Sequence, residues 1–112
     1  MDDWKNIDLC GASEIQKVVC VFHILELYKT PAGQIKIKIL ENVKGEFIGV
    51  PNIAYKAPNG NVNWVSGFGH DVTSALQDTL RSFMESLPNN LPRFGTAEEL
   101  EKNFKWATFK DF

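Results

Sequence analysis

The apolar side chains between Val72 and Leu87 recur every three or four residues and leave polar side chains on the opposite side of a helix. A helix with such a stripe has to bury it against another apolar surface. Asp71 precedes the stripe and is placed to cap the helix by accepting hydrogen bonds from the first free amides, while Pro88 would end the helix. The pattern therefore predicts one long helix over residues 72–87 that packs on the rest of the fold.

The residues before the helix have the patterns of strands. Ile35, Ile37 and Ile39 are separated by polar residues, which predicts a strand with one buried face and one wet face. Lys36 and Lys38 belong to the wet face. We expect this strand to lie in an antiparallel sheet that the long helix covers on the side of the isoleucines.

Residues 18–27 are apolar at both strand parities and can be read in two ways. Ser13-Glu14-Ile15-Gln16 has the form of a capping box, which favours a helix. The β-branched and aromatic residues that follow favour a strand. We predict one short helical turn at most, followed by a strand covered on both faces. Thr30-Pro31-Ala32-Gly33 then predicts the turn into the next strand.

A second hairpin is predicted between Glu46 and Phe68, because Asn59-Gly60 favours a tight turn between strands. Pro51 cannot donate a hydrogen bond to a neighbouring strand, so the first limb is either an edge strand or is bulged near Pro51. The link between the two hairpins is short. The four strands are therefore predicted to form an antiparallel meander.

The C-terminal part offers a second capping box at Thr96-Ala97-Glu98-Glu99, which predicts a short helix from about Thr96 to Asn103. Trp106, Phe109 and Phe112 follow it and are expected to pack against the body or a partner. The predicted fold class is α+β: a four-stranded antiparallel meander sheet packed on one long helix, with a short C-terminal helix. A chain of this length is expected to form a single domain over residues 1–112.

The charge balance limits the classes of partner. The 112 residues carry 12 basic and 14 acidic side chains, a formal net charge of -2, with no run of like charge. This balance counts against non-specific binding of nucleic acid. No apolar run reaches the roughly 20 residues of a membrane-spanning helix, and Met1-Asp2-Asp3 is unlike the start of a secretory signal. We expect a cytoplasmic protein without membrane contact, in which Cys10 and Cys20 are free thiols.

The sequence contains no complete catalytic or nucleotide-binding motif. Gly67-Phe68-Gly69 lacks the third glycine or the lysine of phosphate-binding loops, so we predict that its glycines serve the strand-to-helix junction. Asp71 is committed to capping rather than to orienting His70, and Cys20 and His23 face opposite sides of a strand. We therefore predict no cofactor and no metal. An enzyme built on His70 and Cys20 remains an alternative that requires both groups in one pocket.

The aromatic side chains are the other candidates for function. Trp64 and Phe68 share a strand parity: facing solvent, they would form a binding platform, and facing the helix, the commoner case, they would belong to the core. The predicted binding residues are Trp64, Phe68, Lys36, Lys38, Trp106 and Phe109.

The strand-to-helix transition resembles that of HicB-type antitoxins over about twenty residues, and the resemblance rests on Gly69, Thr73, Ala75 and Leu76. The acidic strand motifs of that family are missing here, so no functional residue is carried over. We expect a small non-enzymatic binding or accessory protein that acts through protein–protein contacts with another protein or with a second copy. The alternative is a single-stranded nucleic-acid-binding module that uses an exposed sheet face with Lys36, Lys38 and Trp64.

Overall fold

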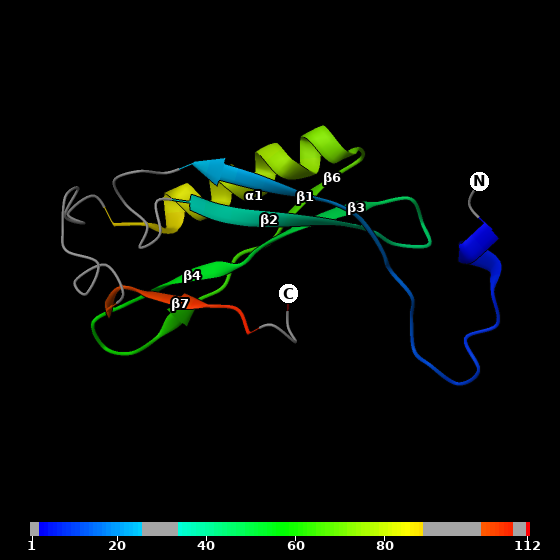
Figure 1. Cartoon of the computed structure of the whole chain (residues 1–112), viewed down its shortest axis with the longest axis horizontal. Coiled ribbons are helices and arrows are strands. Elements are labelled where there is room, and N and C mark those ends of the chain that lie inside the picture. The colour runs from blue at the N-terminus through cyan, green and yellow to red at the C-terminus, as the bar shows by residue number, and fades with distance from the viewer. Residues whose placement is uncertain (1–2, 26–33, 89–101, 109–111) are drawn as a thin grey trace.

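The computed structural model describes residues 3–25, 34–88, 102–108 and 112. Its elements, in chain order, are the 3-10 helix η1 (Asp3–Asn6), the strands β1 (Lys17–Leu25), β2 (Gln34–Glu41), β3 (Phe47–Pro51), β4 (Ile53–Lys56), β5 (Val62–Asn63) and β6 (Gly67–Gly69), the helix α1 (Val72–Ser86), and the strand β7 (Phe104–Trp106). Figure 1 shows α1 lying along one side of the strands. The protein is thus an α+β structure with antiparallel strands and one long helix.

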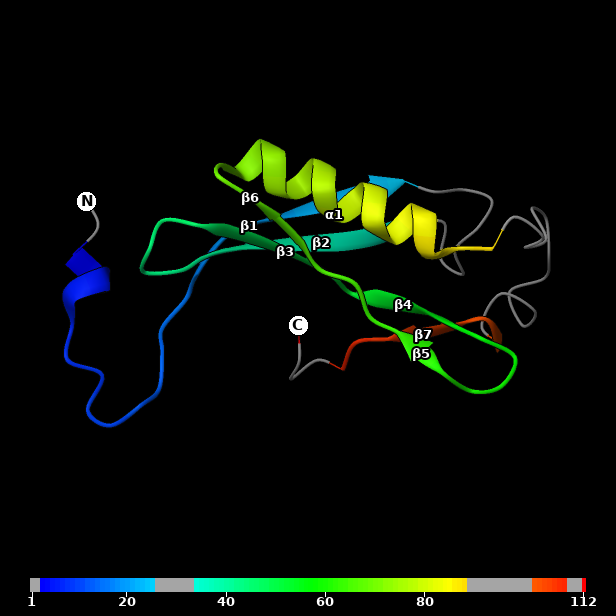
Figure 2. The same ribbon diagram turned by 180° about the vertical axis from the view of Figure 1, so that it is seen from behind.

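Four strands form the larger sheet, in the order β1-β2-β3-β6, and all neighbours are antiparallel. Ile35, Ile37 and Ile39 of β2 are buried and point toward α1, as their alternation predicted. Figure 2 shows α1 in front of this sheet, entered from β6. The packing of α1 on a four-stranded sheet confirms the architecture expected from the helical stripe.

The helix begins and ends where the sequence predicted. Asp71 has extended backbone angles (φ -149°, ψ 174°), and its carboxylate accepts a 2.7 Å hydrogen bond from the amide of Ser74. Leu87 is again extended, directly before Pro88. The side chains that α1 buries completely are Ala75, Thr79 and Phe83.

Three glycines allow α1 to lie directly on the backbone of the sheet. Gly49 and Gly67 are paired across β3 and β6, and a Cβ atom on either would collide with Thr79. A Cβ atom on Gly69 would collide with the main chain at Ala75. The prediction that the glycines around Phe68 serve the strand-to-helix junction is therefore confirmed.

A second, three-stranded sheet has the order β5-β4-β7 and was not predicted. The chain leaves the larger sheet at Asn52, between β3 and β4, and returns to it between β5 and β6. The Asn52 side-chain oxygen accepts a hydrogen bond from the amide of Lys36, while its main-chain carbonyl accepts one from Ala107. The bulge predicted near Pro51 is not found: the register of β3 with β2 runs unbroken to Pro51, and the chain bends at Asn52 directly after it. The edge-strand alternative is wrong, because β3 lies between β2 and β6.

One further expectation for the N-terminal half needs correction. The strand β1 exists, but it is covered on one face only, and Val18, Val21 and Leu25 are exposed. The apolar run at both parities could not tell a doubly covered strand from one with an uncovered apolar face. Ser13-Glu14-Ile15-Gln16 forms no helical turn, which agrees with the prediction of one short turn at most. The short helix η1 lies upstream, where Lys5 forms a 2.7 Å ion pair with Glu41.

Most of the predicted C-terminal helix, Thr96–Asn103, lies outside the described residues. The residues after it form β7, which pairs with β4 so that Phe104 faces Tyr55. The two rings meet edge to face with centroids 6.2 Å apart, and Phe104 is buried in the core. The C-terminal aromatic segment therefore packs against the body over residues 104–106.

Candidate functional site

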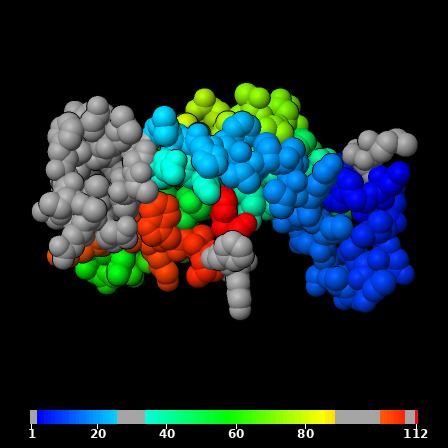
Figure 3. Space-filling model, in the orientation of Figure 1, coloured from blue at the N-terminus to red at the C-terminus, as the bar shows by residue number. Residues whose placement is uncertain are grey.

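The face of the larger sheet that α1 leaves uncovered carries a row of apolar side chains across all four strands. Opposite residues of antiparallel strands project to the same face, and the register pairs Phe68 with Ile48, Ile48 with Leu40, and Leu40 with Val18. We call this side of the larger sheet the open face. In Figure 3, β1 and β2, coloured blue to cyan, lie on the side toward the viewer, beside the orange strand β7.

The two ends of this row are the most accessible. Phe68 is 64% exposed and Val18 is 54% exposed, whereas Leu40 and Ile48 between them are half-buried. Val21 lies in the next row and is also exposed. Contiguous apolar surface, where it is extensive, marks sites of protein contact.

The main chain at Phe68 is hydrogen-bonded to α1, although the Phe68 ring is exposed. Its amide donates a 2.9 Å hydrogen bond to the Asp78 carboxylate on α1. This hydrogen bond, followed by the one from Arg81, lowers the pKa of Asp78 below its ordinary value. The strand that presents Phe68 is therefore fastened to the helix on its outer edge.

The predicted lysines lie on the open face, one residue from each buried isoleucine. Lys38 stands beside Val21 and Val50 in the register, and Lys36 stands beside His23. The ammonium of Lys38 donates a 2.8 Å hydrogen bond to the main-chain carbonyl of Phe112 and lies 4.8 Å from the centroid of its ring. Lys38 is thus already engaged within the chain, which weakens its use for binding phosphates.

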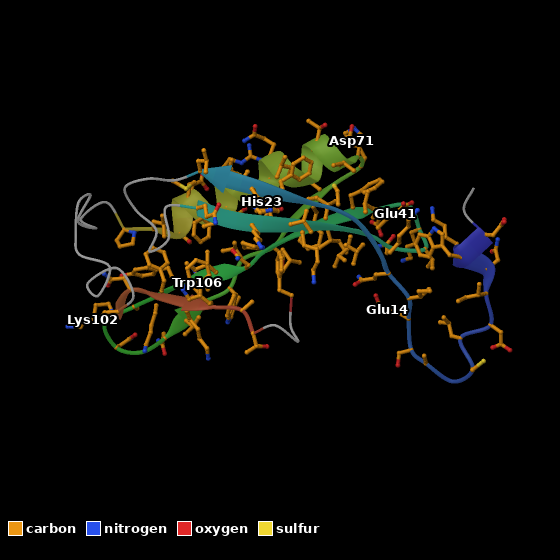
Figure 4. The ribbon with its side chains drawn as sticks, in the orientation of Figure 1. Glu14, His23, Glu41, Asp71, Lys102 and Trp106 are labelled. Carbon is orange, nitrogen blue, oxygen red and sulfur yellow. The ribbon has the colours of Figure 1, made fainter. Side chains whose placement is uncertain are left out.

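The two tryptophans that the sequence predicted as binding residues both line a hollow between the two sheets. Trp64, 46% exposed, and Trp106, half-buried, both line a cavity of about 380 Å³, together with Val50 of the open face and Lys105 of β7. Figure 4 labels Trp106 on β7, below the larger sheet. The remaining predicted binding residue, Phe109, lies outside the described residues.

The groups considered for chemistry are not brought together. Cys20 faces α1 from β1, whereas His70 follows β6 at the opposite edge of the larger sheet, and His70 is paired only loosely with Asp71, at 3.6 Å. Hydrogen bonds from Ser74 lower the pKa of Asp71. Cys10 and Cys20 are free thiols. Within the described ranges, no three His, Cys, Asp or Glu side chains are placed to share a metal ion.

No helix in the described part of the chain is both long and apolar enough to span a bilayer. Comparison with known proteins finds no matching family model, no matching curated protein and no matching solved structure. The resemblance of the strand-to-helix transition to HicB-type antitoxins therefore gains no support.

The sequence indicated Trp64, Phe68 and the lysines but missed Ile48, Leu40 and Val18 as their neighbours. Alternate residues of each strand face the same side of a sheet, so the sequence already showed which residues of one strand lie together. This signal could be used only once the register was known, because a shift of one residue moves every side chain to the other face.

Proposed function

We propose that this chain is a non-enzymatic binding protein whose open face contacts another protein or a second copy. The observation that carries the proposal is the apolar row from Phe68 to Val18, which crosses the larger sheet on the side away from α1. The helix already buries the opposite face. Burial of the open face on a partner would remove further apolar surface from water, at roughly 25 cal/mol for each Å².

Site-specific photo-cross-linking tests the proposal. A benzoylphenylalanine placed at Phe68 should form an adduct with another polypeptide when the full chain is irradiated in cells that produce it. The same photoreactive residue at Gln77, an exposed position of α1, is the matched control and should form little adduct. Equal adducts at both positions, or none at Phe68, would contradict the proposal.

A charge placed in the row should abolish the contact without unfolding the chain. Phe68→Glu replaces an exposed side chain, so the free energy of unfolding of the variant should stay within about 0.5 kcal/mol of that of the parent. Sedimentation of the purified chain, with and without this substitution, separates the two kinds of partner. A mass above that of one chain that falls to the monomer in Phe68→Glu would identify a second copy as the partner.

A further inference from the structure

We propose that the hollow between Trp64 and Trp106, together with the lysines beside it, binds an acidic peptide segment that carries one aromatic side chain. This inference rests on the proposed function and names the partner's chemistry. It concerns a place at the border of the open face, distinct from the row that ends at Phe68.

The shape of the hollow fits one apolar side chain of a partner. Its volume of about 380 Å³ lies in the range of ligand sites, and two indole rings contribute to its lining. Aromatic side chains in such pockets commonly anchor protein contacts, since they bury a large apolar area in few rotamers.

The charged side chains that the structure describes at the hollow and beside it are lysines. Lys105 lines it, and a second hollow of about 380 Å³, which shares Ala107 and Thr108 with the first, is lined by Lys36. No Asp or Glu side chain lines either hollow among the residues that the structure describes. The charged side chains that line the two hollows are therefore lysines on a chain whose formal net charge is -2, and they favour an acidic occupant.

A residue of the chain, Phe112, already makes contacts with a lysine of the kind that such an occupant would make. Phe112 lines the second hollow and gives Lys38 both a carbonyl oxygen at 2.8 Å and a ring at 4.8 Å. A peptide with a carboxylate next to an aromatic ring would likewise offer an oxygen acceptor, to Lys105, and a ring, to the tryptophans. The ammonium and the ring attract each other electrostatically, which adds to the contact.

The test measures binding of a labelled peptide, one phenylalanine flanked on each side by aspartate and glutamate, to the full chain by fluorescence anisotropy. We expect saturable binding that weakens with added salt. Two further peptides replace the phenylalanine with alanine or the acids with their amides, and each should bind at least tenfold more weakly. An oligothymidylate of equal length should also bind more weakly than the acidic peptide.

Substitutions test whether the peptide binds in the hollow between Trp64 and Trp106. Trp64→Ala and Lys105→Glu should each weaken binding by about tenfold or more. Lys44→Glu makes the same charge change at the exposed β2–β3 turn and should have little effect. Circular dichroism of α1 confirms that each variant is folded.

Four results would overturn the inference: no saturable binding of the acidic peptide, equal binding of the acidic and the amide peptides, tighter binding of the oligothymidylate, or unchanged affinity in both Trp64→Ala and Lys105→Glu. The outcome is separable from that of the proposed function. A cross-link at Phe68 without peptide binding removes this inference alone, whereas peptide binding without a cross-link at Phe68 removes the open face as the contact surface.

Discussion

Two aspartates of α1 show how single residues fix the strand-to-helix junction. Asp71 caps the first turn through the amide of Ser74, and Asp78 accepts the amide of Phe68 at the edge of β6. The hydrogen bonds lower the pKa of both carboxyl groups. Each aspartate therefore stabilises the fold in its ionised form.

This arrangement predicts a specific loss of stability in acid. The folded-state pKa of Asp78 lies below the value of about 4 of an unfolded chain, so its stabilisation is present above pH ~4 and is lost as the pH falls through the folded-state pKa. Asp78→Asn should lower the urea midpoint at neutral pH, and the difference from the parent should disappear at about pH 2. Glu85→Gln, on the exposed side of α1, is the matched control. A difference that persists in acid would show that the charge is not responsible.

Capping gives a second prediction at this scale. Asp71→Ala leaves the amide of Ser74 without its acceptor, so thermal unfolding should occur a few degrees lower. Asp71→Ser supplies another capping oxygen and should recover most of the loss. A Ser variant no better than the Ala variant would contradict the capping role.

At the scale of elements, the contact between α1 and the sheet depends on the absence of side chains at three strand positions. A Cβ atom on Gly49 collides with the Thr79 side chain, whereas one on Gly67 collides with the Thr79 main chain as well as with its hydroxyl. The two sites look alike in the sequence. They differ in whether shortening the Thr79 side chain can make room for the added Cβ atom.

A double-mutant cycle tests this difference. Gly49→Ala and Gly67→Ala should each cost about 3 kcal/mol of unfolding free energy, because the helix must move away. Adding Thr79→Ala should recover at least about 1 kcal/mol for Gly49→Ala and almost nothing for Gly67→Ala. Urea unfolding of the single and double variants gives these values. Equal recovery at both glycines would mean that the helix shifts as a whole.

The elements that the sequence predicted well are those with a local pattern. The stripe of α1 and the alternation of β2 each lie within one segment, and both were found with bounds close to the observed ones. The strand β7 was missed, since Phe104 pairs with Tyr55 far away in the chain and no local pattern encodes that pairing. The exposure of Trp64 and Phe68 could not be decided either, because strand parity gives two faces without saying which one a helix covers.

At the scale of the whole molecule, the two sheets are joined at Asn52. Its side chain accepts the amide of Lys36 in β2, and its main chain accepts the amide of Ala107, which follows β7. Asn52, which lies between β3 and β4, thus connects β2 of the larger sheet to the residue that follows β7 of the second sheet. The hollow between Trp64 and Trp106 lies beside this joint, because it is lined by Pro51 and Ala107.

Asn52→Ala should therefore remove the side-chain contact of Asn52 with β2 and keep its main-chain contact with Ala107. The amide of Lys36 loses its acceptor, at a cost of about 1–2 kcal/mol, while the main-chain bond to Ala107 is kept. Hydrogen exchange should accelerate at Lys36 more than at Ala107. Asn52→Asp keeps an oxygen acceptor and should exchange like the parent. Equal acceleration at Lys36 and Ala107 would show that the side chain has no special part in the joint.

The glycines beside Phe68 also affect how the open face meets a partner. Gly67 and Gly69 leave no layer of side chains between β6 and α1, so the strand and the helix pack in direct contact. A partner that contacts the Phe68 ring therefore binds a strand that is already packed on the helix. Little freedom of motion remains there to be lost on association.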